Sequence, residues 1–195
     1  DKVQKSILCD SGADLLIYGM GEKPIVELIR KMKNLLPTEQ ATLTTNEFKT
    51  IVGTIPQTAY LCRAAEWTAA EEDIQLYSHE ECLADKKKQA SNFRHIEEES
   101  NKYAASRITQ AVGNKVVVNP PYPPMSQEEL DHSFDLPYTR LPHPKYKGKR
   151  IPAYDMIKFS VNIHRGCFGG CAFCTISAHQ GKFIVSRSKA SILKE

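Results

Sequence analysis

Apolar and polar residues in the first part of the chain follow the pattern of alternating helices and strands. A helix is predicted to end just before Gly12, a residue type that favours the left-handed conformation found after helices. The apolar run at residues 15–18 has the length and composition of a buried parallel strand. Apolar residues then recur at helical spacing over residues 24–35, where Pro24 suits the first helical position and Pro37 is predicted to end the helix.

The middle of the chain is predicted to contain short strands and one long helix. Short apolar segments at about residues 50–52 and 58–63 predict strands. Two further strands within residues 107–119, with a turn at Gly113, are predicted to form a hairpin. Between them, residues 78–103 are predicted to be helical. The predicted apolar face of that helix consists of Cys82, Phe93, Ile96 and Tyr103.

Residues 119–152 differ in composition, because they contain eight of the 11 prolines. This stretch is predicted to be a stiff, mostly extended connection between two units. A short helix is predicted inside it at residues 126–134, where Ser126 and Glu129 have the spacing of a capping box. Beyond the connection, residues 156–163 are predicted to form a strand, and a helix is predicted to begin after Ser188.

The composition is that of a globular protein. Of its 195 residues, 41% are hydrophobic and 25% are charged, which argues against a disordered, collagen-like or disulfide-dense chain. The 26 basic and 23 acidic residues give a net charge of +3, which indicates no particular partner. The densest basic stretch, residues 145–150, is interpreted as part of a solvated connection.

No membrane-spanning or secretory segment is predicted. The longest apolar runs have four residues, whereas a helix needs about 20 to span a bilayer. The N-terminus has neither an apolar stretch nor an initiator Met, so the chain is expected to be a piece of a longer protein. Its thiols are expected to be reduced in the cytoplasm.

Three of the six cysteines, Cys167, Cys171 and Cys174, form a cluster with the spacing C-x3-C-x2-C. Three thiols this close cannot all pair as disulfides, so the cluster favours metal binding. The neighbouring glycines allow the loop to bend closely around a metal centre. Structural zinc sites and ferredoxin-type clusters each need four protein ligands. Three cysteines would leave one iron of a four-iron cluster free to bind a small molecule.

Other interpretations of the cysteines remain open. His164 or His179 could complete a zinc site with three cysteines. An electron-transfer protein would need a fourth thiolate from elsewhere in the chain. The remaining cysteines lie in apolar segments and are interpreted as core residues; these are Cys9, Cys62 and Cys82.

The cysteine motif, with Phe173 before its last cysteine, resembles the signature of the radical S-adenosylmethionine (SAM) superfamily. Further segments resemble the YgiQ-like family within it. These segments are residues 84–88, 119–121, 136–138, 164–171, 179–182 and 186–188.

The resemblance implies that Cys167, Cys171 and Cys174 bind a [4Fe–4S] cluster and that Phe173 lies near the adenine of SAM. It also implies reductive cleavage of SAM to a 5′-deoxyadenosyl radical, with a one-electron reductant as partner. It identifies no substrate and no catalytic residue within this chain, which is expected to be inactive alone. A competing interpretation is a zinc or iron–sulfur module that docks nucleic acid through residues 145–150.

The same resemblance implies an α/β fold in two parts. Residues 1–150 correspond to a Rossmann-like N-terminal domain that is incomplete at its start. Residues 151–195 correspond to the beginning of the radical SAM core, with the first β/α unit of a partial TIM-type barrel.

Overall fold

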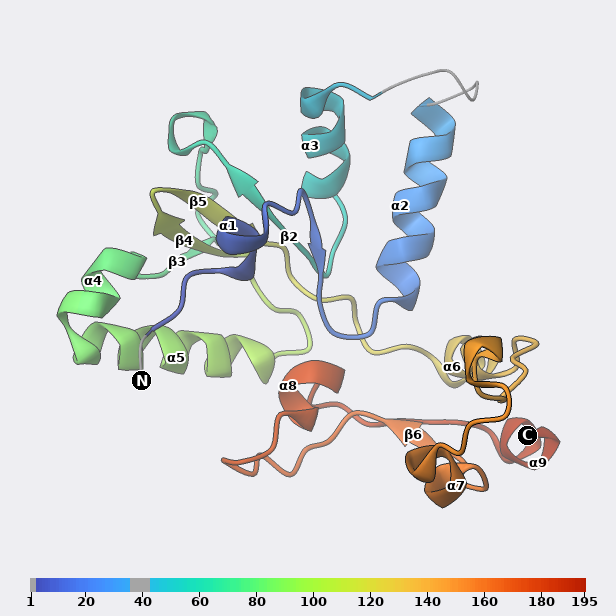
Figure 1. The fold of residues 1–195 in the computed structure, drawn as a ribbon. Helices are drawn as coiled ribbons and strands as arrows, with labels where there is room; N and C mark the ends of the chain where they lie inside the picture. Colours follow the sequence, from blue (N-terminus) through green and yellow to red (C-terminus); the bar gives the residue numbers. More distant parts are fainter. Residues whose placement is uncertain (1–2, 36–42) are drawn as a thin grey trace.

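The computed structural model describes residues 3–35 and 43–195, which form a mixed α/β structure (Figure 1). The α/β class predicted from the sequence is confirmed. The strands are β1 (Leu16–Ile17), β2 (Thr58–Cys62), β3 (Ile74–Gln75), β4 (Ile108–Val112), β5 (Asn114–Val118), β6 (His164–Arg165) and β7 (Val185–Ser186). The helices are α1 (Ile7–Ser11), α2 (Glu22–Leu35), α3 (Thr45–Gly53), α4 (His79–Ala84), α5 (Lys86–Ser100), α6 (Gln127–Phe134), α7 (Pro152–Ile157), α8 (Ile176–Gln180) and α9 (Lys189–Lys194).

The larger sheet has the strand order β1-β2-β5-β4-β3. Its central strands pair antiparallel, so that Tyr60 of β2 and Thr109 of β4 both lie opposite Val117 of β5. Among the described residues of this sheet, only the edge strand β3 runs parallel to its neighbour. The mainly antiparallel pairing differs from the Rossmann-like arrangement expected for residues 1–150.

A different helix covers each face of this sheet, because alternate residues of a strand point to opposite sides. On one face, Leu8 of α1 packs with Ala59 and Val116. On the other face, Val52 of α3 packs with Val117, and α2 lies along the outside of α3. The core therefore sits at the centre of the sheet, around β2 and β5.

Several local predictions are confirmed. The first helix ends at Gly12, whose φ is 68°. The predicted helix over residues 24–35 is α2, while its predicted stop at Pro37 lies outside the described residues. The hairpin of β4 and β5 turns at Gly113, and the helix after Ser126 has the predicted capping box. The helix after Ser188 is also confirmed, with the Ser188 hydroxyl as its cap.

In the first half, one strand prediction is confirmed only in part and another is wrong. Residues 15–18 contain only the short strand β1, which pairs antiparallel with β2 at the sheet edge and is not fully buried. Residues 50–52 lie in α3 and bury their apolar side chains on one side of that helix. The physical reason is a capping box of Thr44 and Glu47, which stabilises the start of a helix.

The single helix predicted over residues 78–103 is two helices, α4 and α5. Asp85 interrupts it with extended backbone angles, and its carboxylate caps α5 by accepting a hydrogen bond from the Lys87 N–H at 2.8 Å. The predicted apolar face is wrong as well, because Phe93 is 61% and Tyr103 63% exposed.

The residues of α5 that are buried are polar, Asn92 and Glu99, and not the predicted apolar ones. The Asn92 amide accepts a hydrogen bond from the Tyr77 N–H and donates one to the Tyr77 carbonyl, both at 2.9 Å. The Glu99 carboxylate accepts a hydrogen bond from the Ser106 N–H at 2.8 Å. The buried side of α5 therefore uses hydrogen bonds to the neighbouring loops.

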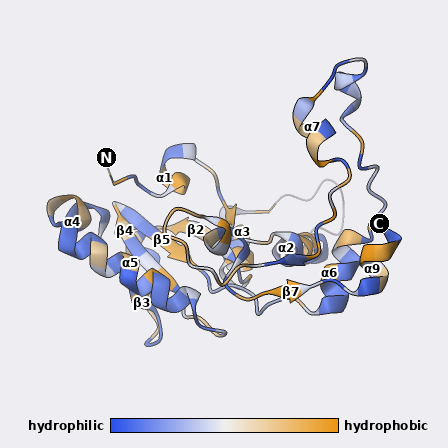
Figure 2. Cartoon of the chain, turned by 90° about the horizontal axis from the view of Figure 1, so that it is seen from below, coloured by the Kyte–Doolittle hydropathy of each residue, from blue (hydrophilic) through white to orange (hydrophobic). Residues whose placement is uncertain are grey.

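The strand predicted over residues 156–163 is wrong. Residues 152–157 form α7, with Pro152 at its first position, and β6 contains only His164 and Arg165. This helix stands apart from the sheet and carries exposed apolar residues (Figure 2). β6 pairs antiparallel with β7, and α9 follows. The domain boundary at residue 150 stays a prediction.

Candidate cofactor loop and adjoining cavity

The three clustered cysteines lie in one loop, residues 166–175, between β6 and α8 (Figure 1). Hydrogen bonds close the base of this loop. The Cys167 N–H donates to the Gly181 carbonyl at 3.0 Å, and the Gly166 N–H donates to the side-chain oxygen of Gln180 at 3.2 Å. The start of the loop is thereby held against the end of α8.

Gly166 occupies the most restricted position of the loop. Its φ is +90°, in the region that favours glycine. A Cβ atom added there would lie 2.0 Å from the carbonyl oxygen of Phe183, far inside van der Waals contact. Glycine is therefore required for the loop to pass beside Phe183.

We expect Gly166→Ala to destabilise the loop by more than Gly170→Ala. Both glycines have positive φ, which costs about 1–3 kcal/mol for another residue. Only at Gly166 does the added methyl also meet backbone, because nothing lies within 4 Å of a Cβ atom at Gly170. Thermal unfolding of the two variants measures the difference. Equal losses of stability would contradict this account of Gly166.

Two of the three sulfurs flank Gly169. The Gly169 N–H donates to Cys167 Sγ at 3.4 Å, and Cys171 Sγ lies 3.8 Å from the Gly169 carbonyl oxygen. The Cys174 N–H donates to the Cys171 carbonyl at 3.0 Å, which makes a tight turn. Within residues 3–35 and 43–195, no group of three or more His, Cys, Asp or Glu side chains is arranged to hold a metal. The loop thus brings the cysteines near one another without gathering all three thiols at one point.

The chemistry of these donors nevertheless fits a thiolate-bound metal centre. The three cysteines are free, with Cys171 exposed and the other two half-buried. Thiolates are the protein ligands of iron–sulfur clusters and of many zinc sites. A backbone N–H close to a sulfur, as at Gly169, stabilises negative charge on that sulfur.

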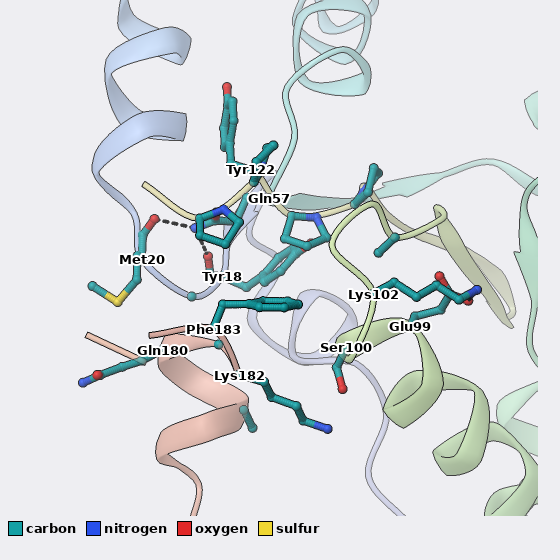
Figure 3. Close-up of a pocket in the computed structure, with 18 of the residues that line it drawn as sticks. Tyr18, Met20, Gln57, Glu99, Ser100, Lys102, Tyr122, Gln180, Lys182 and Phe183 are labelled. Carbon is teal, nitrogen blue, oxygen red and sulfur yellow. Dashed lines mark hydrogen bonds and ion pairs between the residues drawn. The ribbon is translucent and has the colours of Figure 1, made fainter. Parts of the chain in front are cut away.

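A cavity of about 400 Å³ lies between the larger sheet and α8 (Figure 3). The turn after β1 forms one wall and is held by Gln57, whose amide donates to the carbonyls of Tyr18, at 2.7 Å, and Met20. The Tyr18 hydroxyl donates to the Asn119 carbonyl at 2.5 Å, and burial raises the pKa of that hydroxyl. These bonds fix the turn against the start of the proline-rich stretch.

The end of α5 and the segment after the cysteine loop form other walls of the cavity. Lys182 pairs with Glu97 at 2.5 Å. The rings of Tyr103 and Phe183 meet edge to face, with their centroids 5.5 Å apart. These contacts attach the segment after α8 to α5 and to the residues that follow α5.

Residues 1–160 match the family model described as "Radical SAM N-terminal". The chain belongs to that family. The predicted resemblance to YgiQ-like radical SAM proteins is thereby confirmed. The cysteine loop of this Radical SAM N-terminal chain follows the matched residues.

Relatives named "UPF0313 protein" match the whole chain. The identity is 90% over 196 residues with the protein of Bacteroides thetaiotaomicron and 59% over 197 residues with that of Porphyromonas gingivalis. It is 42% over 196 residues with UPF0313 protein GSU2873 of Geobacter sulfurreducens. The chain spans 32%, 29% and 30% of these three proteins, about a third of their length. No solved structure matches the chain.

The aromatic, basic and histidine residues in and beside the loop differ in their exposure and contacts. Phe173 is 91% exposed, so its ring lies on the outside of the loop. Arg165 donates to Met20 Sδ at 3.2 Å and lies 3.4 Å from Glu22 in an ion pair. Arg165 thus connects β6 to the turn after β1. His164 and His179, the two histidines considered above as zinc ligands, are exposed.

The scattered cysteines are placed as core residues, as predicted. Cys82 is buried, its thiol accepts a hydrogen bond from the Asn92 amide at 3.1 Å, and burial raises the pKa of the thiol. Cys9 and Cys62 pack against the two core clusters of the larger sheet.

The sequence interpretation missed the cavity. Its lining comes from residues near 20, 100, 120 and 180, which share no spacing pattern. The sequence predicts only a stiff connection for the proline-rich stretch, whereas its residues 120–124 line the cavity. The sequence feature that could have indicated the cavity is the run of four prolines and one tyrosine at residues 120–124.

None of the helices within residues 3–35 and 43–195 combines the length and apolarity that crossing a membrane requires.

Proposed function

We propose that the longer protein, of which this chain spans about a third, is a radical SAM enzyme. The observation that carries the proposal is the C-x3-C-x2-C loop in a chain of the Radical SAM N-terminal family. Cys167, Cys171 and Cys174 would hold a [4Fe–4S] cluster, and Phe173 would lie beside the adenine of SAM.

The residues of the loop have defined tasks in this proposal. The exposed thiol of Cys171 is open to an incoming cluster, and the Gly169 N–H stabilises the Cys167 thiolate. Gly166 lets the loop close against Phe183. The three cysteines would hold the cluster, which would supply one electron for the reductive cleavage of SAM to methionine and a 5′-deoxyadenosyl radical.

The proposal implies a redox partner and a reducing compartment. A one-electron reductant must deliver the electron, and free thiols need a reducing compartment such as the cytoplasm. The substrate pocket and the remaining SAM contacts are assigned to other parts of the longer protein, so we expect this chain alone to be inactive.

Iron, sulfide and zinc analysis of the anaerobically reconstituted full-length protein tests the proposal. We expect four iron and four sulfide per chain, as a [4Fe–4S] cluster requires. One zinc per chain without sulfide would favour the zinc module instead. That alternative also predicts nucleic-acid affinity that falls steeply with salt and depends on residues 145–150.

A further inference from the structure

The cavity beside the cysteine loop has the size of a small-molecule site. Its volume of about 400 Å³ lies within the range of roughly 300–1,000 Å³ found for such sites. Most of its lining comes from four separate segments of the chain, residues 18–23, 96–108, 118–125 and 177–185, and Gln57, Leu130 and Arg165 complete it. A ligand in this space would contact several elements at once.

The walls of the cavity are rich in apolar rings. Four prolines of the segment 120–124 line it, together with Tyr122. The ring of Phe183 extends toward Tyr18 and the proline rings (Figure 3). The faces of the aromatic rings complement a flat, preferably aromatic, ligand.

The charges around the cavity are already paired. Lys23 pairs with Glu129 at 2.7 Å, and Lys102 pairs with Glu99 at 2.5 Å. Lys182 and Arg165 have carboxylate partners as described above. A charged ligand would lose its hydration without gaining a free counter-charge. The cavity therefore favours an uncharged ligand.

The hydroxyl of Tyr122, which lies among the prolines that line the cavity, is also neutral. The Tyr122 hydroxyl donates to the Glu27 carboxylate at 3.0 Å. Burial and this hydrogen bond raise the pKa of Tyr122 to about 12. The hydroxyl thus stays protonated and uncharged at physiological pH.

Two polar atoms of cavity-lining residues are buried without a hydrogen-bond partner in the described part of the chain, Asn119 Oδ1 and Arg165 Nε. The Asn119 amide nitrogen donates to the carbonyls of Val52 and Ile55, which leaves Oδ1 as an acceptor. Neither atom is exposed, so neither offers a contact to a ligand in the cavity. Recognition of a ligand therefore rests on the ring-lined walls and on the absence of a free charge.

We propose that this cavity binds an uncharged, planar aromatic compound of purine to flavin size. The proposal concerns residues outside the cysteine loop, so it does not depend on a cluster being bound there. The other possible occupant is a different part of the longer protein, which would exclude small molecules.

Riboflavin is a suitable probe, because it is uncharged, planar and fluorescent. Titrated into the full-length protein, it should bind saturably, with fluorescence quenching as it stacks on the tyrosines. Phe183→Ala should weaken binding about tenfold, as expected for losing one ring contact. Phe183→Leu, which keeps most of the side-chain volume, should weaken binding by less. Phe168→Ala is the matched control, since Phe168 is 80% exposed and does not line the cavity.

The absence of saturable binding to the folded full-length protein would overturn the proposal, as would equal affinity of the Phe183 and Phe168 variants. A variant with all three loop cysteines replaced by Ala separates this proposal from the proposed function. We expect that variant to bind riboflavin as the wild type does. Loss of binding only in that variant would assign the ligand to the cysteine loop and overturn the cavity proposal.

Discussion

Replacing Cys167, Cys171 or Cys174 by Ser in the full-length protein is expected to abolish cluster binding. A serine hydroxyl has nearly the size of the thiol but is a far poorer ligand for the iron of a sulfide-bridged cluster. Because the loop offers only three cysteines, each loss leaves two. Iron and sulfide content after anaerobic reconstitution, together with visible absorbance, measures the effect.

Cys9→Ser and Cys62→Ser are the matched controls for these variants. Both cysteines pack against the core of the larger sheet, away from the loop, so the cluster should be retained. Loss of the cluster in a control would indicate a fourth thiolate ligand and an electron-transfer role. A full complement of iron and sulfide in all three loop variants would contradict the assigned ligands.

Replacing Arg187 by Met is expected to destabilise the hairpin that carries the cysteine loop by about 3 kcal/mol. The Arg187 side chain is 0% exposed and forms an ion pair with Glu195. It also donates to the Asn162 carbonyl and to Ser191 Oγ, both at 2.8 Å. Losing one partner of a buried ion pair costs about 3–5 kcal/mol. The lower value applies because Glu195 keeps a second partner, Arg140, at 2.9 Å.

Hydrogen–deuterium exchange of the full-length protein measures this loss locally. Amides of β7 and α9 should exchange about 100-fold faster in Arg187→Met, which corresponds to the expected free energy. Arg94→Met is the control, because Arg94 is 79% exposed and its pair with Glu98 lies on the surface of α5. Such an exposed pair contributes less than about 1 kcal/mol. Unchanged exchange of β7 and α9 in Arg187→Met would contradict the assigned role.

Features determined by neighbouring residues could be predicted from the sequence. The helix after Ser126 follows from a hydroxyl and a carboxylate three residues apart, which pair with each other's backbone N–H groups. The β4–β5 turn follows from the positive φ that Gly113 adopts without strain. The cysteine motif was equally readable, because its three cysteines lie within eight residues of sequence, 167–174.

The errors arose where distant contacts or a competing local signal decided the outcome. The short apolar run at residues 50–52 fits a strand or a buried helix equally well, and the cap at Thr44 decides for the helix. The two halves of the predicted long helix separate because the Asp85 carboxylate caps α5. The cavity depends on contacts such as Lys182 with Glu97, which no local pattern encodes.

The central claim is tested most directly by measuring 5′-deoxyadenosine and methionine released from SAM. The assay uses the anaerobically reconstituted, chemically reduced full-length protein. We predict that both products form in equal amounts and that the variant lacking all three loop cysteines forms neither. A wild-type protein that binds zinc without sulfide and releases no 5′-deoxyadenosine would contradict the account.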